Sequence, residues 1–245
     1  HVSAGLARFT STIKRILRGH IASTTMRTND ILISDSLVSY NRVLNDVVLY
    51  LWIVLFGIDT PYGLVVEFVA CVIPVAIRMK QCWHEYRLSG GTNRQHLLNF
   101  IKYTTNIPPL VVHLLTRRAK DRGELTTTLS AWWYFFAAIN STYLFVWDVK
   151  FDWGLNWFSL RPKRQLLSGP AKYHTAIGLD LVLRFVWLLR YFNYNSDLYL
   201  TYAAVILFGG TSHQCGYALL ETLEILRRWM WCFMKLENDW VNANK

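Results

Sequence analysis

Long windows without charged side chains constrain the fold of this chain more than any other feature. Residues 125–147, LTTTLSAWWYFFAAINSTYLFVW, contain no charged residue, and neither do residues 198–220. Because a helix rises 1.5 Å per residue, about 20 apolar residues cross a hydrocarbon core of about 30 Å. Charged residues make up 17% of the chain, whereas about a quarter is usual in soluble domains. The sequence therefore predicts an all-α, polytopic membrane protein.

Other apolar stretches extend this pattern, and several of the tryptophans lie near their ends, as in an interfacial belt. A soluble helical protein with buried ion pairs is the alternative. Residues 198–215 are expected to form an extra short or interfacial segment, because GGTSHQCG interrupts the apolar run. We predict six crossings, at residues 36–57, 63–80, 97–116, 125–147, 172–190 and 216–236.

The basic residues predict an orientation. The formal net charge is +10, and the positive charge is concentrated in loops between apolar segments, which argues against a nucleic-acid partner. Loops 78–94 and 148–172 are basic, so the positive-inside rule places them and both termini in the cytosol. The basic loop 117–124 departs from this rule. We expect a basic cytosolic N-terminal segment at 1–29, a transmembrane domain at 30–240 and a cytosolic tail at 241–245.

Several predicted crossings contain ionisable residues at membrane depth. Such a charge costs about 2.5–3.5 kcal/mol on insertion scales, so it normally faces a partner or a watery cavity. Asp180 and Arg184 are four residues apart and can pair along one helix. Glu224 precedes Arg227 and Arg228 by three and four residues. One glutamate cannot neutralise two adjacent arginines, which point about 100° apart on a helix.

Lys102 adds a further positive charge, since it has no acidic residue within one turn on either side. Counting each helix separately leaves a surplus of positive charge on three helices, which favours a mobile anion. Arginine matches tetrahedral oxyanions bidentately, and lysine adds a point charge. Tyr103 offers a hydroxyl, and Trp187 offers an indole N–H donor or an aromatic ring that could line a pore. Phosphate or sulfate transport and structural ion pairing both remain open on this evidence.

Four stretches resemble a known family when taken together. Asp35 and Asp46 lie in DILISDSLVSYNRVLND, which is similar to an Asp-x-Leu-x-Ser opening followed by a second aspartate. The other stretches are PVAIRMKQCWHEYR leading into HLLNFIKYTT, then WDVKFDWGL, and finally LRFVW with LRRWMWCFMKLEND. They resemble the EXS domain, the transmembrane part of eukaryotic phosphate exporters related to the xenotropic and polytropic retrovirus receptor. The stretch DILISDSLVSY is most similar to the short fungal Golgi branch of this family, which is named for defective retention of luminal endoplasmic-reticulum proteins.

The resemblance implies six helices around a central anion pathway. The implied phosphate ligands are Lys102, Tyr103, Arg184, Trp187, Arg227 and Arg228. Five acids are expected to line, brace or temper the pathway: Asp35, Asp148, Asp152, Asp180 and Glu224. Asp148 and Asp152 are expected to cap or latch the loop bearing Lys150 rather than to touch phosphate. Val38 departs from the family, where a polar residue often lies three positions after the first aspartate.

The implied function is phosphate transport, returning phosphate from the Golgi lumen to the cytosol and so supporting glycosylation and protein retention. The partners are then phosphate and the bilayer, with glycosyltransferases, a cytosolic coat adaptor or a second copy of the chain as further candidates. The alternatives are a scaffold that retains glycosyltransferases without transport, and the plasma membrane as the location. A membrane enzyme using Asp148 and Asp152 is disfavoured, because no histidine lies within the same turn. No cofactor or metal is expected.

Overall fold

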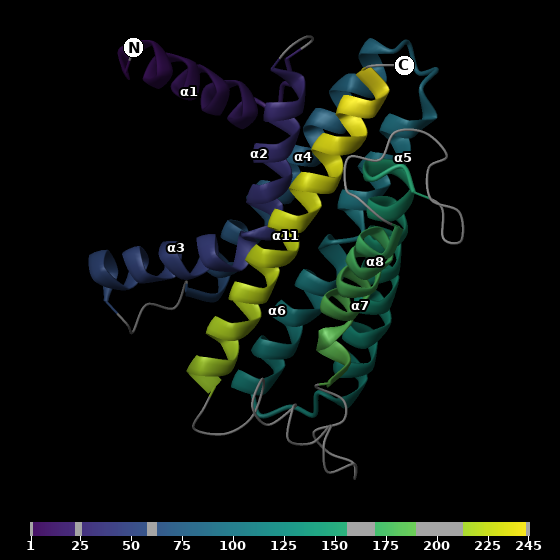
Figure 1. Cartoon of the computed structure of the whole chain (residues 1–245). Coiled ribbons are helices and arrows are strands. Elements are labelled where there is room, and N and C mark those ends of the chain that lie inside the picture. The colour runs from purple at the N-terminus through teal and green to yellow at the C-terminus, as the bar shows by residue number, and fades with distance from the viewer. Residues whose placement is uncertain (1, 23–25, 58–62, 156–169, 190–212, 244–245) are drawn as a thin grey trace. The chain divides into compact units, whose positions relative to one another are not determined.

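The computed structural model describes residues 2–22, 26–57, 63–155, 170–189 and 213–243. Every regular element within these ranges is helical, which confirms the predicted all-α class (Figure 1). The chain forms two compact units, His1–Asn140 and Ser141–Lys245. Most of the predicted segment 198–215 lies outside the described residues.

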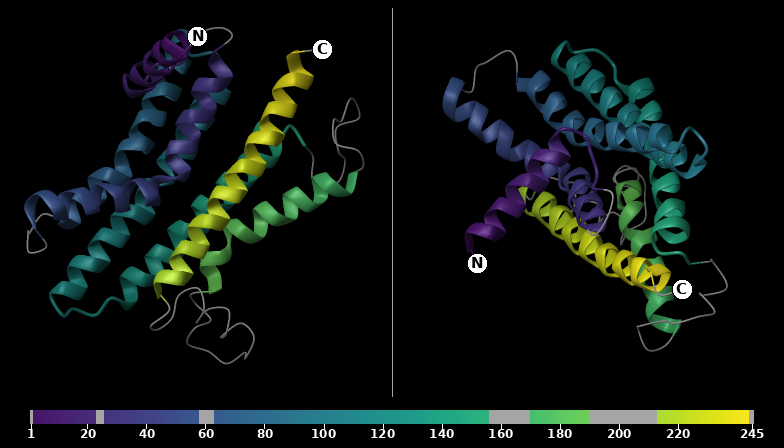
Figure 2. Two further views of the ribbon diagram at one scale, coloured as in Figure 1. Left: turned by 60° about the vertical axis from the view of Figure 1, so that its left-hand side comes forward. Right: turned by 90° about the horizontal axis from the view of Figure 1, so that it is seen from above.

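The first unit is organised around one long helix, α4 (Gly63–Leu88). The helices α2 (Arg27–Ser39), α3 (Asn41–Phe56), α5 (Arg94–Thr104) and α6 (Ile107–Asp121) all contact α4. A further helix, α1 (Val2–Leu17), contacts α2 and runs crosswise to α2 and α4 in both Figure 1 and Figure 2. Buried residues of α4, including Val75, Arg78 and Cys82, recur every three or four positions and so define its core-facing side.

The predicted crossing 36–57 is divided between two helices. The backbone turns at Tyr40, where α2 ends and α3 begins. Asn41 then donates its side-chain N–H to the backbone oxygen of Cys71 on α4 at 2.8 Å. This contact fixes the start of α3 beside α4, and the whole of α3 buries only Asn45.

The predicted crossing 97–116 is also broken, at Thr105 and Asn106 between α5 and α6. The cause is Pro108 and Pro109, because proline lacks an N–H donor and disfavours helical backbone in the residue before it. Asn140 of α7 (Thr127–Trp147) accepts from the Thr105 hydroxyl at 2.9 Å and donates to the Asn106 side-chain oxygen at 3.3 Å. The break therefore has polar partners from another helix.

The second unit contains the end of α7, a short π-helix η1 (Asp148–Asp152), α8 (Pro170–Arg184), the 3-10 turn η2 (Val186–Leu188) and α11 (His213–Ala243). The helix α11 contacts both η1 and α8. The predicted crossing 125–147 corresponds to the continuous helix α7, whereas 216–236 is the middle of the longer α11.

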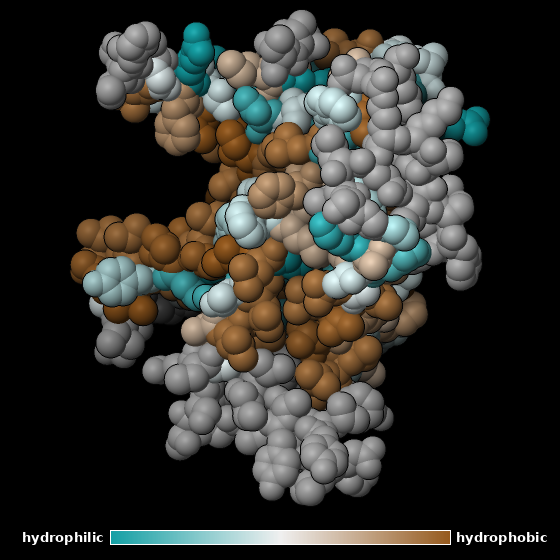
Figure 3. Space-filling view, in the orientation of Figure 1, coloured by the Kyte–Doolittle hydropathy of each residue, from teal (hydrophilic) through white to brown (hydrophobic). Residues whose placement is uncertain are grey.

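Apolar side chains remain on helix surfaces in both units. On α3, Val54 and Leu55 are 63% and 72% exposed, and Figure 3 shows this helix as largely hydrophobic. On α11, Trp229 and Phe233 are exposed in the same way. Within the part of the chain that the structure describes, no helix meets the combined length and hydropathy required to cross a membrane. The six crossings therefore stay a prediction.

Candidate functional site

A buried polar cluster, here called the Arg78 cluster, joins α2, α4 and α5 in the first unit. It consists of Ser34, Asp35, Arg78, Gln81 and Tyr103, each at most 3% exposed. Arg78 Nε lies 2.6 Å from Asp35 Oδ1, and Arg78 Nη2 donates to the Tyr103 hydroxyl at 3.1 Å. The Tyr103 hydroxyl in turn donates to Asp35 Oδ1. Each of these three side chains therefore contacts the other two.

Gln81 extends this cluster toward the start of α2. Its side-chain oxygen accepts from Arg78 Nη1 at 2.6 Å, and its N–H donates to the Ser34 hydroxyl at 3.1 Å. Sequence reasoning named Asp35 and Tyr103 but missed Arg78 and Gln81. The stretch PVAIRMKQCW already indicated their burial, because both polar residues have the helical spacing of the apolar residues on the buried face of α4.

Lys102 lies beside this cluster, in the last turn of α5. It is only 4% exposed, and its Nζ lies 5.3 Å from the centre of the Tyr103 ring. The guanidinium carbon of Arg78 lies 4.9 Å from the same ring, so the aromatic side chain contacts both cations. Val38, the residue that departs from the family pattern, packs against the apolar core formed by Val75, Cys82 and Tyr103.

The second unit contains a separate set of charges, here called the arginine–carboxylate network. It consists of Asp148 from η1, Asp180 and Arg184 from α8, and Glu224 and Arg227 from α11. Arg184 Nε lies 3.0 Å from Asp180 Oδ2, and Arg227 Nη1 lies 2.9 Å from Asp180 Oδ1. Asp180 is completely buried and connects the two arginines, one through each carboxylate oxygen.

Both arginines also have other acidic partners. Arg227 binds the Glu224 carboxylate through two nitrogens, at 2.6 and 2.8 Å. Asp148 forms an ion pair with Arg184 and lies 3.6 Å from Arg227. Counting charges helix by helix missed Asp148, because it reaches the arginines from a different element. Among the described residues, three carboxylates surround these two guanidinium groups, which gives both arginines acidic partners.

The remaining predicted ligands of this unit lie at the edge of the network. Arg228 is 7% exposed, and its guanidinium carbon lies 4.3 Å from the centre of the Trp231 ring. The Trp187 indole donates to the Ser141 hydroxyl at 3.0 Å, and that hydroxyl donates to the backbone oxygen of Arg184 at 3.2 Å. Trp187 thus contacts the arginine-bearing turn through Ser141.

Asp152 holds the loop after η1 against α11. Its side chain lies 3.3 Å from the Trp231 indole nitrogen and 3.6 Å from Lys235 Nζ, while its backbone oxygen accepts from Asn238 at 2.9 Å. Gly154 approaches α11 so closely that an added Cβ would lie 2.6 Å from the Asn238 side-chain oxygen. Asp152 therefore latches this loop to α11, whereas Asp148 belongs to the arginine–carboxylate network.

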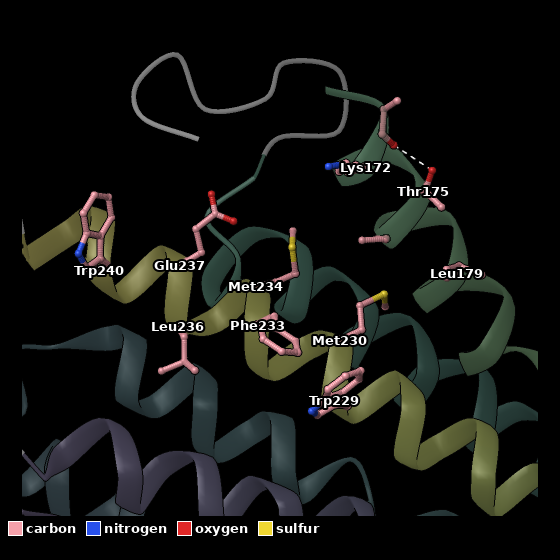
Figure 4. A pocket seen from close by; sticks show the side chains of 12 residues that line it. Lys172, Thr175, Leu179, Trp229, Met230, Phe233, Met234, Leu236, Glu237 and Trp240 are labelled. Carbon is pink, nitrogen blue, oxygen red and sulfur yellow. Dashed lines mark hydrogen bonds between the residues drawn. The ribbon is translucent and has the colours of Figure 1, made fainter. Parts of the chain in front are cut away.

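A cavity of about 910 Å³ also lies in the second unit, between the outer faces of α8 and α11. Figure 4 shows that its walls are mainly apolar, with Leu179, Met230 and Phe233 among them, and Lys172 and Thr175 at one end. None of the predicted phosphate ligands lines this cavity. Each unit therefore contains its own buried charged group as a candidate for anion binding, and the predicted ligands in these groups lie outside this cavity.

Comparison with known proteins identifies relatives over most of the chain. The EXS family profile matches residues 3–241. The chain is 30% identical to Protein ERD1 of Saccharomyces cerevisiae over 93% of its own length and 59% of that protein. It is 28% identical to Protein ERD1 homolog 1 of Schizosaccharomyces pombe, covering 86% of this chain and 56% of that one. It is 31% identical to human Solute carrier family 53 member 1, covering 76% and 26% respectively.

Proposed function

The chain belongs to the EXS family, and from this premise we propose that it is a transmembrane transporter of inorganic phosphate. The chain spans less than two thirds of the curated relatives it matches, 59% in the case of the Saccharomyces protein. We therefore propose a role in transport only for the residues of this chain. We also propose that the chain forms the six predicted crossings, in the orientation inferred from the charge distribution.

Asp180 lies between Arg184 and Arg227, at 3.0 and 2.9 Å respectively, and this position carries the proposal. Two guanidinium groups are held by the two oxygens of one buried carboxylate. A tetrahedral oxyanion can likewise present oxygens to both arginines, and as a dianion it carries more charge than one carboxylate. Phosphate can therefore take the place of a carboxylate in contact with one or both arginines.

The acids of the network allow bound phosphate to be released. Buried arginines without partners carry a large desolvation penalty, so carboxylates must hold them between successive phosphates. Asp148, Asp180 and Glu224 provide these resting partners. Conduction requires binding that is favourable enough for entry and weak enough for release, and competition from three carboxylates keeps the binding weak.

The Arg78 cluster and Lys102 form the contribution of the first unit. Lys102 offers an ammonium group and Tyr103 a hydroxyl, both groups that bind phosphate oxygens. At rest the Tyr103 hydroxyl donates its one hydrogen to Asp35 and accepts from Arg78, so it binds phosphate when a phosphate oxygen takes the place of Asp35. We propose that phosphate contacts both groups of residues during its passage, with Arg228 and Trp187 completing the ligand set of the second unit.

For the compartment, we propose the Golgi membrane, with phosphate moving from the lumen to the cytosol. Support comes from the similarity to two fungal ERD1 proteins over 93% and 86% of this chain. The likeness to the human solute carrier covers 76% of the chain and supports a role in transport. Removal of luminal phosphate would sustain glycosylation, from which it arises as a by-product.

The test is phosphate flux in proteoliposomes that contain the purified protein. Arg227→Lys keeps the charge and removes the fork, and Arg228→Ala removes a cation at the edge of the network. Both variants should lose most of the flux while still eluting as a single folded species. Arg122→Ala, a change of an arginine whose side chain is 72% exposed, is the control and should transport normally. Unchanged flux in both variants would refute the assignment.

The scaffold function makes a different prediction for the same variants. The basic N-terminal segment offers a surface for a coat adaptor or for glycosyltransferases without any need for transport. If retention is the whole function, Arg228→Ala will leave glycosyltransferase retention in cells unchanged, and neither the natural protein nor the variant will carry phosphate into vesicles. Loss of flux and retention together supports transport as the basis of retention.

A further inference from the structure

The helix α1 is strongly amphipathic. At about 100° per residue, its larger apolar side chains fall in an arc of roughly 100°, and its basic residues fall on the opposite side. We call the apolar arc the α1 stripe; its members with described side chains are Leu6, Phe9, Ile13, Ile16 and Leu17. The opposite face carries Arg8, Lys14, Arg15 and the nearby Arg18.

The outer half of the α1 stripe is not covered by the first unit. Leu6, Phe9 and Leu17 are 62%, 59% and 59% exposed, whereas Ile16 is 1% exposed. A helix whose stripe belonged to the core of this unit would be buried along its whole length. The stripe therefore packs within the unit at Ile16, at one edge of the arc, and its outer part, Leu6, Phe9 and Leu17, is available to another surface.

The direction of α1 is fixed at its base. Arg15 binds both carboxylate oxygens of the buried Asp30 at 2.6 Å, and the backbone N–H of Ala22 donates to the same carboxylate at 2.8 Å. Gly19 ends the helix with a φ of 73°, in the left-handed region that favours glycine. These contacts hold α1 crosswise to α2 and α4, as Figure 2 shows from two sides.

The base of α1 lies at one end of a predicted crossing. An added Cβ on Gly19 would lie 2.5 Å from the side chain of Lys80, the last residue of the predicted span 63–80. One residue further along, the ring of His20 contacts that of His84 at 4.8 Å between centroids. In the proposed orientation, this end of α4 faces the cytosol, so α1 begins at the level of the cytosolic lipid head groups.

From these observations we infer that α1 is an interfacial helix that docks on the anionic cytosolic leaflet of its own membrane. The inference rests on the proposed membrane-spanning function and adds a lipid-binding surface to it. The outer stripe enters the boundary of the acyl chains, and the basic face contacts lipid phosphates and carboxylates. Charge complementarity identifies the occupant, because the first 29 residues contain no acid and Arg8, Lys14 and Arg18 add positive charge beyond Arg15 and Arg27, which pair with Asp30 and Glu85.

The base of α1 is also connected to the Arg78 cluster. Asp30, which holds Arg15, accepts from the Ser34 hydroxyl through its backbone oxygen at 2.6 Å. Ser34 accepts from Gln81, and Gln81 accepts from Arg78, at 3.1 and 2.6 Å. The surface that meets the lipid is thus joined by hydrogen bonds to residues that position Tyr103.

The test measures the depth of two positions on α1 in the complete protein. A nitroxide label is placed at Phe9→Cys on the stripe or at Ala7→Cys on the opposite face, after replacement of the four natural cysteines by serine. The protein is reconstituted in phosphatidylcholine vesicles with and without phosphatidylserine. With phosphatidylserine, the label at position 9 should be accessible to oxygen and protected from a water-soluble nickel chelate. The label at position 7 should remain accessible to the chelate.

The charge dependence is tested by replacing Arg8, Lys14 and Arg18 together by glutamine. Each lost charge weakens surface binding about fivefold, so docking should fall on the order of a hundredfold. The matched control replaces Arg118, Lys120 and Arg122, which are exposed on or just after α6, and should leave the depth of position 9 unchanged.

Three results would overturn the inference. In one, position 9 is as accessible to the chelate as position 7 in both kinds of vesicle. In another, its depth is independent of phosphatidylserine and of the three basic residues. In the third, position 9 becomes protected only when a cytosolic protein is added, which would assign the stripe to a protein partner. A protein that transports phosphate while position 9 stays in water contradicts this inference alone, whereas a protein that fails to insert into vesicles contradicts the transport proposal as well.

Discussion

Asp180 holds Arg227 by an oxygen–nitrogen contact of 2.9 Å that links α8 to α11. The carboxylate is completely buried, and its other oxygen pairs with Arg184. Neither arginine can lose this partner without leaving part of its positive charge uncompensated in a region of low water content. If the proposed function is right, the pair connects the stability of the second unit to the binding of phosphate.

The variant Asp180→Asn should test this connection directly. The amide keeps the size of the side chain but removes one negative charge, so the folded state should lose about 1–3 kcal/mol. Added phosphate should restore part of the lost stability, because an anion replaces the missing charge. Thermal unfolding of the purified protein with and without phosphate measures both effects.

Asp239→Asn provides the matched control for that experiment. Asp239 pairs with Lys235 at 3.3 Å, and its side chain is 31% exposed. This change should alter stability by less than about 1 kcal/mol, and phosphate should add no extra stabilisation to it. Equal phosphate responses in the two variants would contradict a role for Asp180 in anion binding.

Gly154→Ala should destabilise the second unit for two separate reasons. Gly154 has a φ of 62°, which costs about 1 kcal/mol for alanine, and the new methyl group would collide with Asn238. Gly123→Ala isolates the first effect, since Gly123 has a φ of 72° and no atom within 4 Å of an added Cβ. Chemical unfolding of both variants should show the larger loss of unfolding free energy at position 154. Equal losses would mean that Asn238 and α11 move aside without an energetic penalty.

Arg78→Leu and Asp35→Leu should each be strongly destabilising, by about 3–5 kcal/mol, because each leaves a buried charge without its main partner. The double variant should lose much less than the sum of the two, since both charges are then absent. The free energy of unfolding for all four proteins completes the cycle. Arg117→Ala and Glu67→Ala, which break an exposed pair at 2.9 Å, should show additive losses below about 1 kcal/mol.

Cys82 lies just beyond the predicted crossing 63–80, and burial raises the pKa of its thiol from an ordinary value of 9.0 to about 11. The folded state thus favours the neutral thiol. Its contribution to stability is complete below pH 9 and is lost as the pH rises to about 11, because the unfolded chain ionises first. The stability difference between the natural protein and Cys82→Ala should therefore shrink over this range, and a constant difference would contradict the prediction.

The sequence predicted helices well and their interruptions poorly. The window 125–147 forms the continuous helix α7, as its composition requires. The crossing predicted at 97–116 is divided because Pro108 and Pro109 outweigh the apolar pattern around them. The break at Tyr40 had no such marker, since it depends on the contact of Asn41 with α4.

The candidate ligands were easier to find than their partners. Lys102, Arg227 and Arg228 were noticeable in the sequence because charges are rare in apolar segments. Pairing along one helix was also predictable, and Arg227 does bind Glu224 at three residues' distance. The contact of Asp148 with Arg184 joins residues that are 36 positions apart. Only the folded chain could reveal that contact. The partners of Arg78 could likewise be identified only from the folded chain.

The interruption between α5 and α6 has a consequence for biogenesis. Hydrocarbon offers no hydrogen-bonding partners, so a helix with an open break is unstable when it is surrounded by lipid. The partner that binds the side chains of Thr105 and Asn106 is Asn140, which the ribosome adds some thirty-five residues later. If the segment 97–116 crosses the membrane as proposed, it must therefore wait near the translocon, or in a watery vestibule, until α7 has been synthesised. A ribosome stalled before Asn140 should then leave it accessible to water-soluble reagents.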